Sequence, residues 1–178
     1  STDNTAALAK RLGAAAISLP CNLGYGGAVQ NGFKYAVENG YDVPADDLAR
    51  SAQQFEEGTY PTNRAFFGEE PNPGIDNDPR IHIFNGNVPG VAGYFYSPNQ
   101  FSRRINPFSN EREIFYVNLT VRRPGTEGYD STLAHEFQHM IHWNNDRNEE
   151  TWVNEGMSML AEQLNGFSVV DYGLAYLA

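Results

Sequence analysis

The sequence predicts an α+β protein in which a small, mostly antiparallel sheet packs on two helices. Three β-prone segments follow one another at residues 80–85, 91–97 and 112–120. Two amphipathic helical stretches come after them, at residues 133–143 and 150–162. We expect the sheet to pack on the first of these two helices, with the second helix beside it.

The composition describes a globular protein and excludes several kinds of partner. Of the 178 residues, 40% are hydrophobic and 13% are aromatic, which is enough for a sizeable core. The net charge of −10 argues against nucleic acid and against an anionic membrane surface, because both bind basic faces. No apolar run approaches the roughly 18–20 residues of a membrane-spanning helix. The single cysteine, Cys21, rules out an internal disulfide and a thiolate-rich zinc site.

The first 43 residues are organised differently from the rest. Helix, buried strand, glycine-rich turn and second helix are expected at residues 2–12, 14–19, 22–27 and 28–40. Strand, glycine turn and helix together form the pattern of an α/β unit. We therefore predict an α/β appendage at residues 1–43 and a second domain at residues 44–178.

The first segment resembles part of the family 2 glycosyltransferases of the dolichol-phosphate-mannose synthase type. The likeness is carried by Ser1-Thr2-Asp3-Asn4-Thr5, Ile17-Ser18-Leu19-Pro20, Asn22-Leu23-Gly24-Tyr25-Gly26-Gly27-Ala28 and Gly32-Phe33-Lys34-Tyr35-Ala36. In that family an aspartate pair precedes the first of these motifs, and an Asp-x-Asp metal motif follows the last. Neither motif is present here, so nucleotide-sugar transfer has no residues to carry it.

The stretch between the appendage and the first strand combines a helix and a loop. Residues 44–60 favour a helix, because Pro44 suits a first turn and acidic residues follow it. A Pro/Gly/Asp-rich loop comes next at residues 68–80. Asp76 and Asp78 in this loop are candidate Ca²⁺ ligands, since alternate carboxylates bind hard cations. No full calcium loop follows them, and Asx turns are the simpler interpretation.

The strongest chemical signal is the motif His135-Glu136-Phe137-Gln138-His139 in the first of the two late helices. Histidines four residues apart on a helix present both rings on one face, one turn apart. Two imidazoles at that spacing can bind one zinc ion. Glu136 then lies beside the metal, where its carboxylate can take a proton from a water that the metal activates. The motif therefore predicts Zn²⁺ as cofactor and Glu136 as general base.

A catalytic zinc site needs a third protein ligand, and the second late helix supplies the best candidate. His142 is excluded on a straight helix, because it lies two turns, roughly 10 Å, from His135. Glu155 follows His139 by 16 residues, which is long enough for the chain to turn and bring an antiparallel helix alongside. Glu162 lies two turns further on the same face, where it is a candidate partner that orients a ligand histidine.

The two helix motifs together resemble the gluzincin metallopeptidases. The motif Trp152-Val153-Asn154-Glu155-Gly156 is similar to the ligand helix of the zinc aminopeptidases. The larger pattern, over about residues 55–167, resembles secreted bacterial metallopeptidases of the hyicolysin type. It is carried by Pro73-Gly74-Ile75-Asp76-Asn77-Asp78-Pro79-Arg80, Gly93-Tyr94-Phe95, Asn106-Pro107-Phe108-Ser109-Asn110-Glu111 and residues 134–143.

The resemblance implies zinc ligands at His135, His139 and Glu155, with Glu136 as base and acid, and an extracellular location. Such catalytic domains continue well beyond the glutamate helix. We therefore expect this chain, which starts at Ser1 without a methionine, to be a fragment or processed form that lacks the closing C-terminal subdomain. The missing subdomain is expected to affect catalytic activity more than metal binding.

These features predict a zinc endopeptidase that acts on an extended peptide or protein substrate. The substrate is expected along a sheet edge at residues 92–97, since edge pairing holds a peptide backbone without reading its sequence. The oxyanion needs a further donor, and Tyr172, Tyr129 and His142 are the candidates. The alternatives are a zinc-binding or structural module without catalysis and, from residues 1–43, a glycosyltransferase fragment.

Overall fold

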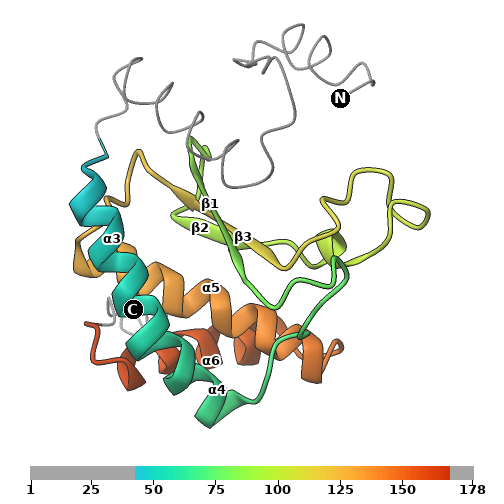
Figure 1. Ribbon diagram of the computed structural model, residues 1–178. Helices are drawn as coiled ribbons and strands as arrows, with labels where there is room; N and C mark the ends of the chain where they lie inside the picture. Colours follow the sequence, from blue (N-terminus) through green and yellow to red (C-terminus); the bar gives the residue numbers. More distant parts are fainter. Residues whose placement is uncertain (1–42, 169–178) are drawn as a thin grey trace, which may run out of the picture. The chain divides into compact units, whose positions relative to one another are not determined.

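The computed structural model describes residues 43–168 (Figure 1). The chain divides into two units, Ser1–Val43 and Pro44–Ala178, and the fold below is that of the second unit. The elements predicted within residues 2–40, the glycosyltransferase-like motifs and Tyr172 lie outside the described residues. The identities of the two domains stay predictions.

The first helical region is longer than the sequence predicts. It consists of α3 (Ala45–Gln54), a π-helical turn η1 (Phe55–Thr59) and α4 (Tyr60–Phe67), without a break between them. The predicted helix ended at residue 60, whereas the helical region continues past Pro61 to Phe67. The π turn just before Pro61 shifts the register of the backbone hydrogen bonds. Pro61 therefore lies in the first turn of α4, where its missing N–H is tolerated. The helix ends at Gly68, whose φ of 96° favours glycine.

The sheet is mixed, which corrects the prediction of a mostly antiparallel one. Its strands are β1 (His82–Gly86), β2 (Gly93–Phe95) and β3 (Ile114–Asn118), in the order β1-β3-β2. β3 is parallel to β1 and antiparallel to β2. The sheet is mixed because β3 lies between the two earlier strands instead of adding to an edge, and it is parallel to one of them and antiparallel to the other. All three strands lie within the predicted segments except for the last residue of β1, and β2 is the shortest because a 3₁₀ turn, η2 (Ser97–Gln100), follows it.

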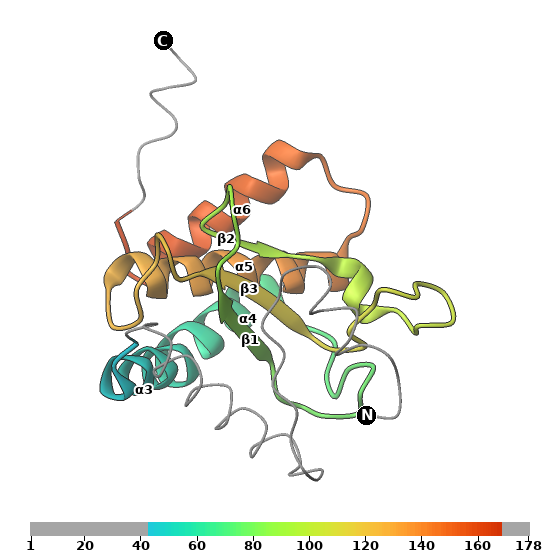
Figure 2. The ribbon, with the colours of Figure 1, turned by 90° about the horizontal axis from the view of Figure 1, so that it is seen from above.

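Two long helices, α5 (Glu127–Asn145) and α6 (Thr151–Leu164), complete the fold. All helices labelled in Figure 1 lie on one side of the sheet, which agrees with the predicted α+β class. The core forms where α5 meets the sheet and η1. Its buried members are Phe55, Phe115, Val117, Tyr129, Leu133, Phe137, Met140 and Ile141. Seen from above, β2 lies toward α6 and β1 toward α3 and α4 (Figure 2).

The far face of the sheet carries a row of aromatic rings. Phe84, Tyr116 and Tyr94 are paired across the three strands, with ring centroids 5.5 Å and 4.4 Å apart. Phe84 is about half exposed. Among residues 43–168, no helix is both long enough and apolar enough to cross a membrane.

Candidate metal centre

The helix α5 places the two motif histidines on one face. Thr126 caps its N-terminus by accepting a hydrogen bond from the Tyr129 backbone N–H. The apolar side chains at positions 133, 137, 140 and 141 are buried against the sheet and η1. His135 and His139 point instead toward α6, with ring centroids 4.8 Å apart.

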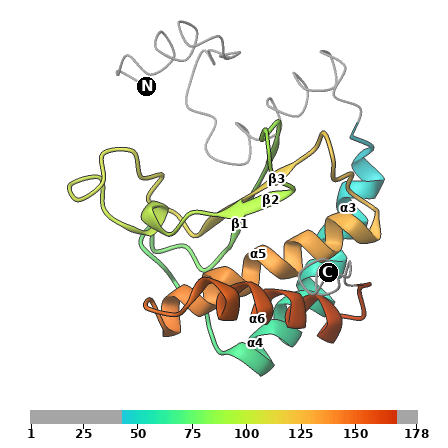
Figure 3. The ribbon, with the colours of Figure 1, turned by 180° about the vertical axis from the view of Figure 1, so that it is seen from behind.

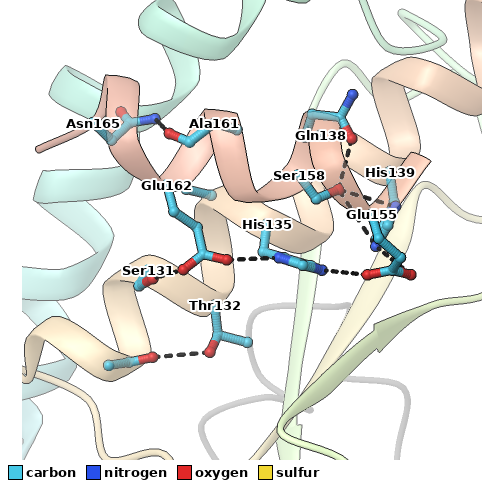
Figure 4. Close-up of polar contacts among 12 residues, drawn as sticks. Ser131, Thr132, His135, Gln138, His139, Glu155, Ser158, Ala161, Glu162 and Asn165 are labelled. Carbon is cyan, nitrogen blue, oxygen red and sulfur yellow. Dashed lines mark hydrogen bonds and ion pairs between the residues drawn. The ribbon is translucent and has the colours of Figure 1, made fainter. Parts of the chain in front are cut away.

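Glu155 on α6 faces both rings (Figure 4). Its Oε2 lies 3.3 Å from His135 Nε2, and its Oε1 lies 3.7 Å from His139 Nε2. One ligand atom from each of the three residues lies within 4.8 Å of the others. Bonds of about 2.0–2.1 Å in a tetrahedral zinc site put neighbouring ligand atoms about 3.3 Å apart, so this donor set fits a zinc ion.

The outward nitrogens of the two histidines have partners that accept hydrogen bonds. His135 Nδ1 lies 2.7 Å from Glu162 Oε1, and Glu162 also accepts a hydrogen bond from Ser131. His139 Nδ1 lies 2.9 Å from Asn154 Oδ1. Since a carboxylate and an amide oxygen only accept, both Nδ1 atoms carry the proton and both Nε2 lone pairs are left for a metal.

Glu162 was expected from the sequence in this position, whereas Asn154 was not. The one feature of the sequence that points to Asn154 is its position next to Glu155, on the same turn of an amphipathic helix. An asparagine at that position has no distinctive spacing of its own, so only the packing of α6 on α5 identifies its partner.

The charges of the site interact strongly in the absence of a metal. Burial alone would lower the pKa of His135, but its hydrogen bonds with Glu155 and Glu162 outweigh burial and raise that pKa to about 10. Burial, together with the positive charge of His135, lowers the pKa of His139. The hydrogen bond with His135 lowers the pKa of Glu155. The site thus favours a positive charge beside Glu155. In the metal-free chain, protonated His135 is that positive charge.

Glu136 lies beside this group, under the edge strand β2. It is only 5% exposed, and burial raises its pKa to about 7. The backbone of Phe95 forms a hydrogen bond with its carboxylate. A Cβ at Gly93 would lie 2.7 Å from Thr132 Cγ2 and 3.1 Å from Glu136 Oε1, so glycine is needed for β2 to approach α5 this closely.

The three candidate oxyanion donors differ in how they are placed. The Tyr129 hydroxyl donates to Asn85 Oδ1 of β1 at 2.8 Å, and burial raises the pKa of this tyrosine to about 12. His142 Nδ1 lies 3.4 Å from Gln138 Nε2, in a polar chain that continues through Ser158 to His139. Tyr172 lies outside the described residues. The oxyanion donor therefore stays a prediction.

The candidate calcium residues form a second cluster, in the loop before β1. Ligand atoms of Asp76, Asp78 and His82 lie within 4.8 Å of one another. Arg112 Nη1 lies 3.1 Å from Asp76 Oδ2 and 2.9 Å from His82 Nε2, and Arg80 forms an ion pair with Asp78. Asp76 and Asp78 also accept the backbone hydrogen bonds of Asx turns. Two arginines thus neutralise these carboxylates, and calcium binding stays a prediction.

Comparison with known proteins supports a distant relationship to the metallopeptidases. The chain is 26% identical over 146 residues to the neutral metalloprotease ShpI of Staphylococcus hyicus, an alignment that covers 70% of this chain and 32% of that protein. The chain therefore spans about a third of the length of that protease. No protein-family model matches the chain. The likeness of residues 1–43 to glycosyltransferases has no support in these comparisons.

Proposed function

We propose that this chain is a zinc-dependent peptidase of the gluzincin type, with His135, His139 and Glu155 as metal ligands. The observation that carries the proposal is the convergence of three ligand atoms within 4.8 Å of one another, two of them on imidazoles that are already oriented by Glu162 and Asn154. The distant likeness to a metalloprotease supports the same class.

Glu136 is the general base of the proposed reaction. A bound zinc ion would supply Lewis-acid activation of water and of the substrate carbonyl. The Glu136 carboxylate takes one proton from the attacking water and delivers it to the leaving nitrogen as the C–N bond breaks. The second water proton then passes from the new carboxylic acid to the amine, so the products are a carboxylate and an ammonium group. The buried position of Glu136 beside β2 keeps bulk water from its carboxylate.

The free edge of β2 is the proposed binding strand for an extended peptide. Among residues 43–168, β2 pairs with β3 on one side only, and it lies on the α6 side of the sheet (Figures 2 and 3). A peptide that adds to this edge gains backbone hydrogen bonds and runs past Glu136. Cleavage within a chain is favoured over removal of terminal residues, as the sequence predicts. The extracellular location expected from the resemblance stays a prediction.

The first test is the zinc content of the purified 178-residue chain, measured by elemental mass spectrometry. We expect about one zinc per chain, lost in Glu155→Ala and kept in the matched control Glu149→Ala, an exposed glutamate in the preceding loop. Zinc retention by Glu155→Ala would refute the assignment of the third ligand.

Hydrolysis is tested separately from metal binding. We expect cleavage of an unfolded protein substrate that stops with a chelator and returns with zinc. Glu136→Gln should keep zinc and lose hydrolysis, because the amide cannot accept the proton. Zinc binding without any hydrolysis by the unmodified chain would favour the other candidate, a zinc-binding module without catalysis.

A further inference from the structure

Arg122 is a partly buried cation beside the proposed active site, and the proposed reaction does not use it. It lies in the connection between β3 and α5. Its Nε donates to Thr132 Oγ1 at 2.9 Å, and Thr132 Oγ1 in turn donates to the Gly128 carbonyl at 2.8 Å. The side chain crosses Gly128, where a Cβ would lie 3.8 Å from Arg122 Cδ. The guanidinium is thus held over the first two turns of α5.

The residues that Arg122 contacts in these first turns lie on the same face of α5 as the proposed metal ligands. Positions 128, 132, 135 and 139 follow the spacing of one helical stripe. Thr132 also lies where β2 packs closely on α5, since a Cβ at Gly93 would meet both Thr132 Cγ2 and Glu136 Oε1. Arg122 therefore lies beside the β2 edge proposed for the peptide, on the side of Glu136 away from His139.

The charge of Arg122 is not neutralised locally. Among residues 43–168, arginines 50, 64, 80, 103 and 112 form ion pairs with carboxylates, whereas Arg122 forms none. Its other hydrogen bond within this part of the chain is a long one, from Nη1 to the Val121 carbonyl at 3.4 Å. In a chain of net charge −10, an oriented guanidinium without a carboxylate partner is available to bind one.

The topology shows which part of a substrate would reach it. β3 leads through a short connection into α5, which runs back along the sheet, and β2 is antiparallel to β3, so β2 and α5 run in the same direction (Figure 1). A peptide that pairs antiparallel with β2, the stronger form of strand pairing, runs opposite to α5. Its residues after the scissile bond then extend toward Thr132 and Arg122.

The distance limits this contact to the first two residues after the scissile bond. Thr132 precedes the midpoint between the two histidines by about five residues, or roughly 7.5 Å along the helix. An extended peptide advances about 3.3 Å per residue, so two residues cover this length.

We propose that Arg122 binds a carboxylate in the first two residues on the leaving-amine side of the scissile bond, so that the site prefers acidic peptides there. This inference rests on the proposed peptidase function. The carboxylate has two sources, an Asp or Glu side chain or the free C-terminus of a short substrate. An acidic side chain extends the proposed endopeptidase, and a free C-terminus would make the enzyme remove terminal residues.

The test compares cleavage and binding of matched peptides by the zinc-loaded chain. A peptide mixture is digested, and mass spectrometry of the new N-termini reports the residues after each cleaved bond. Peptides with Glu, Gln or Lys at those two positions are then compared, each with an amidated and a free C-terminus. Labelled versions are also titrated against zinc-loaded Glu136→Gln by fluorescence anisotropy, which reads binding without turnover.

We expect the unmodified chain to prefer Glu over Gln by roughly fivefold in kcat/KM and in affinity, the effect of one partly exposed ion pair. Arg122→Gln should remove this preference, Arg122→Lys should keep part of it, and Arg122→Glu should reverse it in favour of Lys. Arg123→Gln is the matched control, because it removes the same charge from the adjacent exposed position and should leave the ratio unchanged. Circular dichroism and zinc content verify that each variant is folded.

The outcomes separate the two proposals. Cleavage with equal rates for Glu and Gln peptides, or a preference that survives in Arg122→Gln, refutes the role of Arg122 and leaves the peptidase standing. A preference that requires the free C-terminus refutes the side-chain source and keeps the carboxylate site. Failure of the zinc-loaded chain to cleave or bind any peptide contradicts the peptidase, and the role of Arg122 with it.

Discussion

Asn154 offers the sharpest test of how the metal site is held. Its Oδ1 lies 2.9 Å from His139 Nδ1, and Ser158 Oγ lies 3.1 Å from the same nitrogen. If Asn154 orients His139, replacing it with Leu, which is similar in size but cannot accept a hydrogen bond, should weaken zinc binding. Replacing it with Asp, which accepts the same hydrogen bond with a full charge, should strengthen zinc binding.

The expected magnitudes follow from the chemistry of the acceptor. A neutral hydrogen bond contributes a net 0.5–1.5 kcal/mol or so, and Ser158 partly replaces the lost acceptor, so Asn154→Leu should weaken zinc affinity about fivefold. A charge-assisted bond is about twice as strong, so Asn154→Asp should tighten it by a similar factor. Burial and the charge of His135 lower the pKa of His139, so at pH 7.5 zinc displaces no proton from this ring.

The assay is competition for zinc with a chromophoric chelator at pH 7.5. Asn148→Asp, in the exposed loop before α6, introduces the same charge away from His139 and serves as control. Equal affinities for the Leu and Asp variants would refute the reasoning, and so would an effect of the control as large as that of Asn154→Asp.

Three further changes have expected outcomes that the structure determines. Glu162→Gln, which removes the charge that faces His135, should weaken zinc affinity by about tenfold in the same competition assay. Burial raises the pKa of Glu113 above 4.5, so ionising this carboxyl lowers the stability of the fold as the pH rises through the folded-state pKa. Glu113→Gln should therefore unfold at a higher temperature than the parent at pH 8. This difference in unfolding temperature should vanish near pH 4. Gly93→Ala should lower stability by about 1–3 kcal/mol in urea titrations, because the new methyl group meets Thr132 at 2.7 Å, and an unchanged midpoint would contradict this close packing.

The sequence was sufficient where one local pattern determines the structure. The spacing of His135 and His139 within an apolar-periodic stretch predicts both the helix and the shared face, and both are found in α5. Glu155 was found by counting the residues needed to turn between two antiparallel helices. The structure brings its carboxylate to both rings, while its role as ligand stays a proposal.

The sequence was insufficient where the outcome depends on distant contacts. Strand order could not be predicted, because the pattern at residues 112–120 is the same for an edge strand and for the central strand that β3 becomes. The π turn before Pro61 has no sequence signal of its own. Asn154 and Arg122 were missed for a related reason: each is a common polar residue whose partner is identified only once two elements pack together.

Metal binding and peptide handling depend on different contacts of α5, and this difference makes them separable by experiment. The proposed ligands and the groups that orient them lie on α5 and α6, which pack directly against each other. The proposed peptide contacts depend instead on the approach of β2 to α5 at Gly93. Gly93→Ala should therefore reduce peptide hydrolysis and leave zinc affinity within about twofold, because it disturbs Glu136 and the strand edge without touching α6. Asn154→Leu should do the reverse. It should lose zinc affinity, and its peptide preference, measured at saturating zinc, should change little. A loss of zinc in Gly93→Ala as large as in Glu155→Ala would show that the strand edge and the ligand helices behave as one unit.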